Sequence, residues 1–258
     1  MASEKVRRAR AGYLVSPERR PTLRGSLVGW LHTSGAWLAL TAVYTFAVAW
    51  NTGFEPYAVA PRVIFAVATC WCTWLSDWLH NLDLKMGPKA SVEAEFLFYR
   101  MDMLSISVIM TVQFLLWGFN CAWAAGSAQG VVSCAATVLN AAVLFWPGAA
   151  FLRHNAYLSV AVKVVYGVQF ALLGWLGYVW VFHTKCGIAT SIWFVYLPGF
   201  LAYASKPLVG DYFEHFGPHE FFHAFVWAGH VVTMGIDVSM SSPWSTECPA
   251  GRVEVTWD

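Results

Sequence analysis

Long apolar runs follow one another along almost the whole chain, and they limit the possible folds more than any other feature. A helix needs about 20 mostly apolar residues to cross the hydrocarbon core of a bilayer. The composition agrees with such spans, because 58% of the 258 residues are hydrophobic and only 12% are charged, against roughly 25% charged in soluble domains. We therefore expect an all-α integral membrane protein.

Reading windows of this length predicts a seven-transmembrane-helix bundle. The expected spans are residues 27–50, 62–82, 99–118, 131–146, 156–182, 188–208 and 220–239. The fourth is the shortest, and the Ala/Gly-rich stretch before it blurs its start. Without an internal repeat or a long linker, the chain reads as one domain over residues 26–240, with a basic tail at 1–25 and a second tail at 241–258.

Positive charge is distributed unevenly between the two sides of this bundle. Residues 1–25 carry seven Lys or Arg and no apolar core, so we expect no cleavable signal peptide. The side of this tail receives twelve Lys or Arg, whereas the opposite side receives three, namely Arg62, Lys185 and Arg252. Because cytosolic loops are enriched in positive residues, we expect a cytosolic N-terminus and an extracytosolic C-terminus.

The six cysteines do not form a zinc-type CxxC pair. Cys70 and Cys72 lie inside the second span, where we expect small core residues. Cys121, Cys186 and Cys248 all fall on the extracytosolic side, where one disulfide can form if that face is oxidising. The sequence does not select the pair.

Polar residues within the spans are the informative ones, because an ionisable group at the centre of a bilayer costs about 2.5–3.5 kcal/mol. The second span ends in WLSDWLHNLD, with Ser76 and His80. The third begins with FYRMDMLSIS, which contains Asp102. The seventh begins with GPHEFFHAFVWAGH, which contains His219 and His223. Since even spans end and odd spans begin on the side of the N-terminus, all five side chains are expected at one depth.

The spacing of these residues predicts a metal site. Residues i and i+4 are neighbours on a helix, so Ser76 shares a face with His80, and His219 shares one with His223. A histidine pair of this kind commonly presents two nitrogens to one metal, and His80 would supply a third. Three nitrogens leave an open position for water, which is the catalytic pattern of zinc. Zinc is the first choice, and iron and copper stay open.

Other polar residues within or next to the spans have simpler explanations. We expect His230 and His32 to be hydrogen-bonded core residues. Asp77 points to a different helix face from Ser76, and solvation should suffice for it and for Asp83 at the interface. Lys163 in the fifth span would snorkel or pair with a buried acid.

Taken together, SDWLH (76–80), RMDMLSIS (100–107) and HEFFH (219–223) resemble the signature of the CREST superfamily. That group includes alkaline ceramidases, progestin and adipoQ receptors, bacterial haemolysin-III-like proteins and GPI-processing proteins. The resemblance extends over all seven spans, and RMDMLSIS is similar to the Lys-Leu-Asp-Tyr-x-Gly-Ile-Ser element of the adipoQ-receptor branch. It does not fix the subfamily, because the interval from His80 to Asp102 is longer than in most branches and no acidic first-span element is evident.

The resemblance implies a zinc ion held by His80, His219 and His223, with Ser76 and Asp102 beside the water that zinc activates. It also implies hydrolysis of an amide or ester bond in a membrane lipid, either ceramide-like or phospholipid-like. Asp102 would act as general base and then as acid. Ser76 would donate a hydrogen bond to the developing oxyanion or orient His80 or the water.

The main alternative is a seven-span receptor or membrane interaction protein whose zinc is a structural clamp, with Asp102 directly on the metal. A haem-binding electron carrier is disfavoured, because it would need histidines facing one another at two depths. A retinal protein would need a lysine in the last span, which has none. The basic tail suits topology or anionic lipids, so we expect no nucleic-acid partner. The lipid, the membrane compartment and the oligomeric state stay open.

Overall fold

All described elements of the computed structural model are helices. The structure describes residues 34–80, 92–120, 127–145, 164–169, 171, 195–203 and 218–241, and for a few of these only the backbone. The longer helices are α3 (Ser34–Asn51), α4 (Pro56–His80), α6 (Val92–Asn120), α7 (Ser127–Phe145) and α10 (Pro218–Ser241). Residues 164–169 and 195–203 are also helical. A described helix therefore overlaps each of the seven predicted spans.

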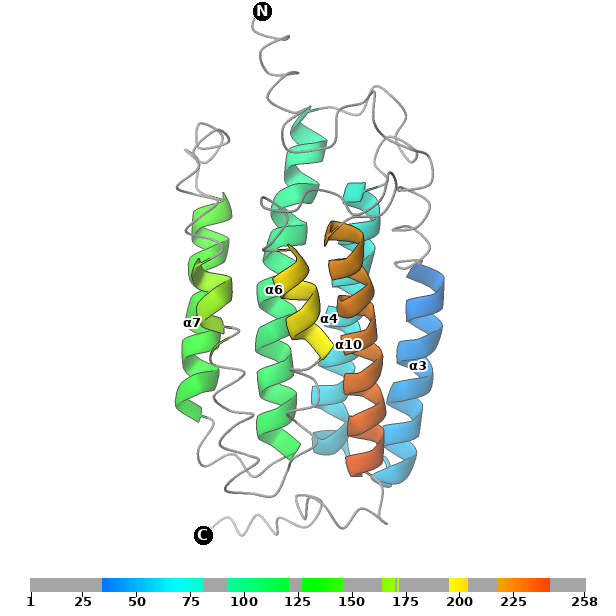
Figure 1. Ribbon diagram of the computed structural model, residues 1–258. Coiled ribbons are helices and arrows are strands. Elements are labelled where there is room, and N and C mark those ends of the chain that lie inside the picture. The colour runs from blue at the N-terminus through cyan, green and yellow to red at the C-terminus, as the bar shows by residue number, and fades with distance from the viewer. Residues whose placement is uncertain are drawn as a thin grey trace, which may run out of the picture.

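The helices lie side by side as a bundle with their axes roughly aligned (Figure 1). Helix α4 packs against α3 and α6, α6 also packs against α7, and α10 packs against α3. The colours of Figure 1 show that α4 runs in the opposite direction to α6 and α10. The end of α4 and the beginnings of α6 and α10 therefore lie at the same end of the bundle.

A tight turn joins α3 to α4. The amide of Phe54 donates to the carbonyl of Ala49 at 2.7 Å, and that of Gly53 donates to the carbonyl of Trp50 at 3.3 Å. These two bonds form the Schellman pattern of a helix C-terminus. Gly53 has a φ of 65°, which glycine adopts without steric cost. Pro56 then occupies the first position of α4, where its fixed φ suits the helix and its missing N–H costs nothing.

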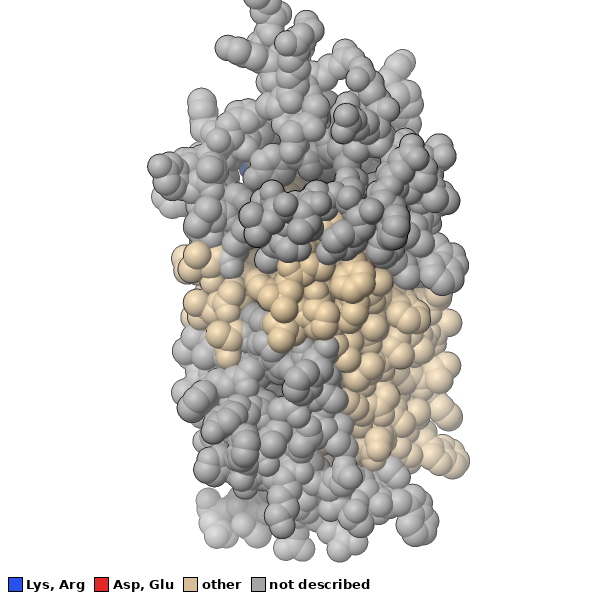
Figure 2. All heavy atoms as spheres, viewed as in Figure 1, with Lys and Arg blue, Asp and Glu red and all other residues tan. Residues whose placement is uncertain are grey.

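The described surface is apolar and the described interior is partly polar. Large hydrophobic side chains are exposed along the outer faces of several helices, among them Leu38, Val43, Trp50, Val67, Val138 and Leu201. Figure 2 shows that, in this view, the described surface consists almost wholly of residues other than Lys, Arg, Asp and Glu. Two described segments, Pro56–His80 and Glu220–Ser241, are long and apolar enough to cross a membrane. This distribution suits a bundle surrounded by lipid.

The helix bounds differ from the predicted spans in one consistent way: α4, α6 and α7 begin several residues earlier than their predicted spans. The prediction began the second span at Arg62 and counted this charge on the extracytosolic side, whereas Arg62 is buried inside α4. The two predicted tails lie largely outside the described residues, as do His32, Asp83, Lys163, Cys121, Cys186 and Cys248.

Candidate functional site

Two of the predicted site residues lie on the last turn and a half of α4. The side chain of Ser76 is buried, and that of His80 is partly buried. Their spacing of four places them on one face of the helix. Trp78 lies on a different face of α4, and its ring is stacked on that of Phe98 near the start of α6, with centroids 5.3 Å apart. The end of α4 is therefore held against the helix that carries Asp102.

The rings of His80 and His223 meet across the gap between α4 and α10. Their centroids are 4.9 Å apart and their planes make an angle of 85°. His223 is buried. The sequence alone predicted this approach of the second and the last span, and the structure brings the two rings into contact.

His219 lies in the first turn of α10, one turn before His223, but its side chain is outside what the structure describes. In the described part of the chain, no group of three His, Cys, Asp or Glu side chains is placed to hold a metal ion. The convergence of three imidazoles therefore stays a prediction.

Asp102 lies on α6, and its side chain is buried. The Ser76 hydroxyl lies beside the Asp102 carboxyl. The geometry falls short of a regular hydrogen bond, because Ser76 Oγ has no hydrogen-bond partner among the described residues. A buried hydroxyl without a partner is costly, and this one lies between a carboxyl and the turn that carries His80.

His230 lies two turns deeper in α10 than His223 and is buried. Its Nδ1 is 3.0 Å from the hydroxyl of Tyr196, which accepts a hydrogen bond of 2.8 Å from Nε2 of Gln113. The edge of the Trp37 ring packs against it, with ring centroids 5.6 Å apart. The prediction that His230 is a hydrogen-bonded core residue is confirmed.

The predictions for Asp77 and for the two cysteines of the second span can also be compared with the structure. Asp77 was expected to rely on solvation, which is wrong, because its side chain is 7% exposed and lies within the bundle. Its neighbour Trp78 takes the more peripheral position. Cys72 is buried and Cys70 partly buried next to Thr41, so both are small interior residues as predicted.

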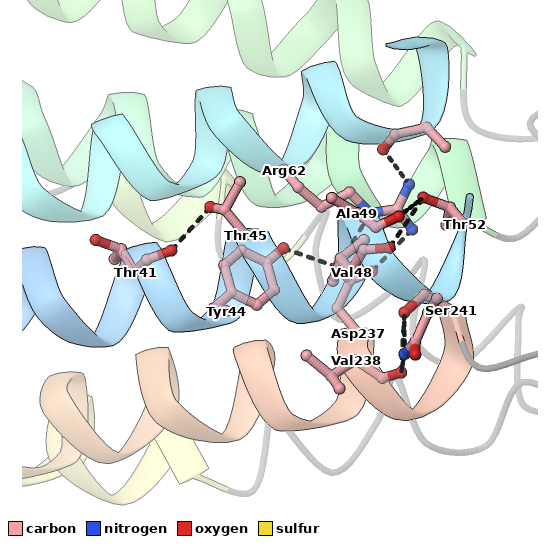
Figure 3. Close-up of polar contacts among 12 residues, drawn as sticks. Thr41, Tyr44, Thr45, Val48, Ala49, Thr52, Arg62, Asp237, Val238 and Ser241 are labelled. Carbon is pink, nitrogen blue, oxygen red and sulfur yellow. Dashed lines mark hydrogen bonds and ion pairs between the residues drawn. The ribbon is translucent and has the colours of Figure 1, made fainter. Parts of the chain in front are cut away.

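Sequence reasoning missed two polar clusters in the interior. One joins α6, α7 and residues 164–169 through hydrogen bonds among Ser107, Thr111, Thr137, Asn140 and Gln169. The other joins α3, α4 and α10 through Tyr44, Arg62 and Asp237 (Figure 3). For the second cluster the sequence did offer a signal, because each of two apolar runs contains a charged residue: Arg62 in the second span and Asp237 in the last.

The helix bundle, its apolar surface and its buried polar residues define a seven-span integral membrane protein. A family model described as haemolysin-III related matches residues 22–234, which is most of the chain. The protein therefore belongs to the haemolysin-III-related family, and the predicted resemblance is confirmed at this level. No curated protein and no solved structure matches the chain.

Proposed function

We propose that the protein is a zinc-dependent hydrolase that cleaves an amide or ester bond of a membrane lipid within the bilayer. The observation that carries this proposal is the contact between the imidazoles of His80 and His223 at one end of the bundle. Membership of the haemolysin-III-related family supports it, since the resemblance implies zinc bound by histidines of the second and last spans.

The spacing of the two rings fits a shared zinc ion. Imidazole nitrogens are common zinc ligands, and the rings of His80 and His223 would hold the ion between α4 and α10. The observed separation between His80 and His223 is 4.9 Å. His219 would complete the set of three nitrogens from the first turn of α10. When bound, zinc acts as a Lewis acid that polarises a carbonyl and makes water nucleophilic near neutral pH.

The buried carboxyl of Asp102 and the hydroxyl of Ser76 would perform the remaining steps. Asp102 would accept a proton from the attacking water and return it to the leaving amine or alkoxide, which is ordinary general base and acid catalysis. Ser76, with no described hydrogen-bond partner of its own, would donate to the oxygen on which negative charge develops. The products would be a fatty acid and the alcohol or amine that carried it.

The test is the metal content of detergent-purified protein, measured by plasma mass spectrometry, together with hydrolysis of ceramides, lysolipids and GPI-type lipids. We expect about one zinc per chain in the wild type and none in His80→Ala or His223→Ala. His230→Gln is the matched control, because it changes another buried histidine of α10 and should keep the metal. A wild-type protein that folds without metal would contradict the proposal.

Asp102→Asn separates hydrolysis from the receptor alternative. If Asp102 acts as a base, the variant keeps its zinc and loses activity by roughly 10²–10⁴-fold. If Asp102 instead ligates a structural zinc, Asp102→Asn loses the metal, as His223→Ala does. The wild type then shows no turnover on any lipid. The second result would favour a receptor or membrane interaction protein.

A further inference from the structure

A buried ion pair joins α4 to α10 at the end of the bundle opposite the histidines. Nε and Nη2 of Arg62 donate to the two carboxylate oxygens of Asp237, each at 3.1 Å. The hydroxyl of Tyr44 on α3 donates to the same carboxylate at 2.7 Å. All three residues are at most 3% exposed. Figure 3 shows them converging from three helices.

The geometry of this cluster makes it a directional contact. A guanidinium and a carboxylate joined by two parallel hydrogen bonds fit in one orientation, unlike an apolar contact. The remaining donor Nη1 of Arg62 is held by the carbonyl of Ala58 on the same helix at 2.7 Å. The arginine is therefore fixed to α4, and the position of Asp237 along α10 is set by the arginine.

The histidines lie at a matching distance along both helices. His80 follows Arg62 by 18 residues, and Asp237 follows His219 by 18 residues. Eighteen residues make five complete helical turns and a length of about 27 Å. Because α4 and α10 run in opposite directions (Figure 1), pairing residue 62 with residue 237 brings residue 80 to the first turn of α10, level with His219 and about one turn from His223.

Between these two ends, apolar side chains of α4 and α10 belong to one buried cluster. Phe65 of α4 and Met234 of α10 belong to the same buried cluster as Trp37 of α3. Such side chains tolerate small shifts along the helix axis, because apolar packing is not directional. The ion pair, in contrast, is a directional contact between α4 and α10.

We propose that the cluster of Tyr44, Arg62 and Asp237 positions the metal ligands by setting the axial register between α4 and α10. This inference rests on the proposed function for its consequence, the affinity for zinc, but the register itself can be measured without metal. The cluster is about four to five helical turns away from the histidines along the two helices, so it acts on them only through the position of the two helices.

The experiment compares three proteins in lipid nanodiscs: the wild type, Asp237→Asn, and a triple variant Tyr44→Phe, Arg62→Met and Asp237→Leu. Asp237→Asn leaves a buried arginine without its charge partner and is expected to unfold more easily. The triple variant replaces the whole cluster by apolar side chains, which often restores stability. It no longer specifies the register, so stability and register can be measured separately.

Two measurements are made on each protein. The first is zinc affinity by competition with a chelator. The second is the distance between nitroxide labels at Val67→Cys on α4 and Trp227→Cys on α10, two outward-facing positions, by pulsed electron paramagnetic resonance. The six native cysteines are first replaced. Thr137→Val, which removes part-buried hydrogen bonds of α7 to α6 and to Gln169, is the matched control and should match the wild type in both measurements.

We expect the triple variant to be as resistant to heat as the wild type, but to bind zinc roughly 10-fold or more weakly. We also expect its label distance to broaden or shift by between one residue and one turn, about 1.5–5.4 Å. A triple variant with the wild-type distance and zinc affinity would overturn the proposal. If the wild type binds no zinc, the proposed function fails, and the label distance alone then decides the question of register.

Discussion

The surroundings of the Ser76 hydroxyl indicate its role. It is buried on the turn that precedes His80, beside Asp102, and makes no hydrogen bond within the described part of the chain. A serine that orients His80 would already donate to its ring. A buried hydroxyl without a described partner suits a donor that forms its hydrogen bond only when a substrate is bound.

Ser76→Ala is therefore expected to keep the metal and to slow turnover. The loss of one donor to a developing oxyanion lowers kcat by about 10²–10³-fold. Zinc content and the kinetics of lipid hydrolysis are measured on the same preparation. A variant whose zinc affinity falls, with kcat unchanged once the metal is restored, would show that Ser76 orients His80 instead.

At this scale the sequence predicted the approach of His80 and His223 and the burial of Asp102, since polar groups in a bilayer need a task or a partner. The pairing of Arg62 with Asp237 was not predicted. Spacing along a helix identifies neighbours within that helix, but it does not say which helices are adjacent, and Arg62 was counted on the extracytosolic side.

At the scale of elements, the contact between residues 195–203 and α10 depends on glycine. A Cβ at Gly229 would come within 2.2 Å of the Tyr196 ring, and one at Gly199 within 2.6 Å of the Phe225 side chain. Small residues let transmembrane helices approach closely. Tyr196 cannot easily move aside, because its hydroxyl is held by Gln113 and His230.

Gly229→Ala is expected to destabilise the protein by about 1–3 kcal/mol through overpacking. Gly235→Ala, on the same helix but with no atom within 4 Å of the added methyl group, is the matched control. It should be neutral or stabilising by about 0.5–1 kcal/mol. Apparent melting temperatures in detergent provide the comparison. Equal melting temperatures for the two variants would mean that Tyr196 packs elsewhere.

The sequence predicted the existence and order of the described helices better than their starts. Hydropathy detects the part of a helix that lies in hydrocarbon, whereas α6 extends from Val92, before the apolar run begins. A charged residue also marks the end of a membrane span only when it has no partner of opposite charge within the bundle. The neutralisation of Arg62 by Asp237 lets α4 begin at Pro56.

At the scale of the whole molecule, the bundle is polar within and apolar outside. Buried hydrogen bonds among Ser107, Asn140 and Gln169 hold α6, α7 and residues 164–169 together. The exposed side chains are those that lipid accepts. The histidine end of the bundle is the end at which α3 begins (Figure 1), so the predicted cytosolic N-terminus would place the candidate site near the cytosolic face.

This orientation can be tested with the native cysteine of the C-terminal tail. In a chain that retains Cys248 alone, we expect a membrane-impermeant maleimide to label intact cells after mild reduction, because the C-terminus is predicted to be extracytosolic. A chain whose single cysteine is at Ala2→Cys should be labelled only after permeabilisation. The reverse pattern would invert the topology and place the histidine end outside.

The pairing of Arg62 with Asp237 has a consequence for biosynthesis. The two residues are 175 positions apart, and at a ribosomal rate of about 5–20 residues per second the arginine waits roughly 9–35 s for its partner. During that interval a charge sits in a newly inserted helical hairpin without its counter-ion. Asp237 arrives only with the last helix, so a chain that stops before α10 would keep the arginine in the bundle without this carboxylate.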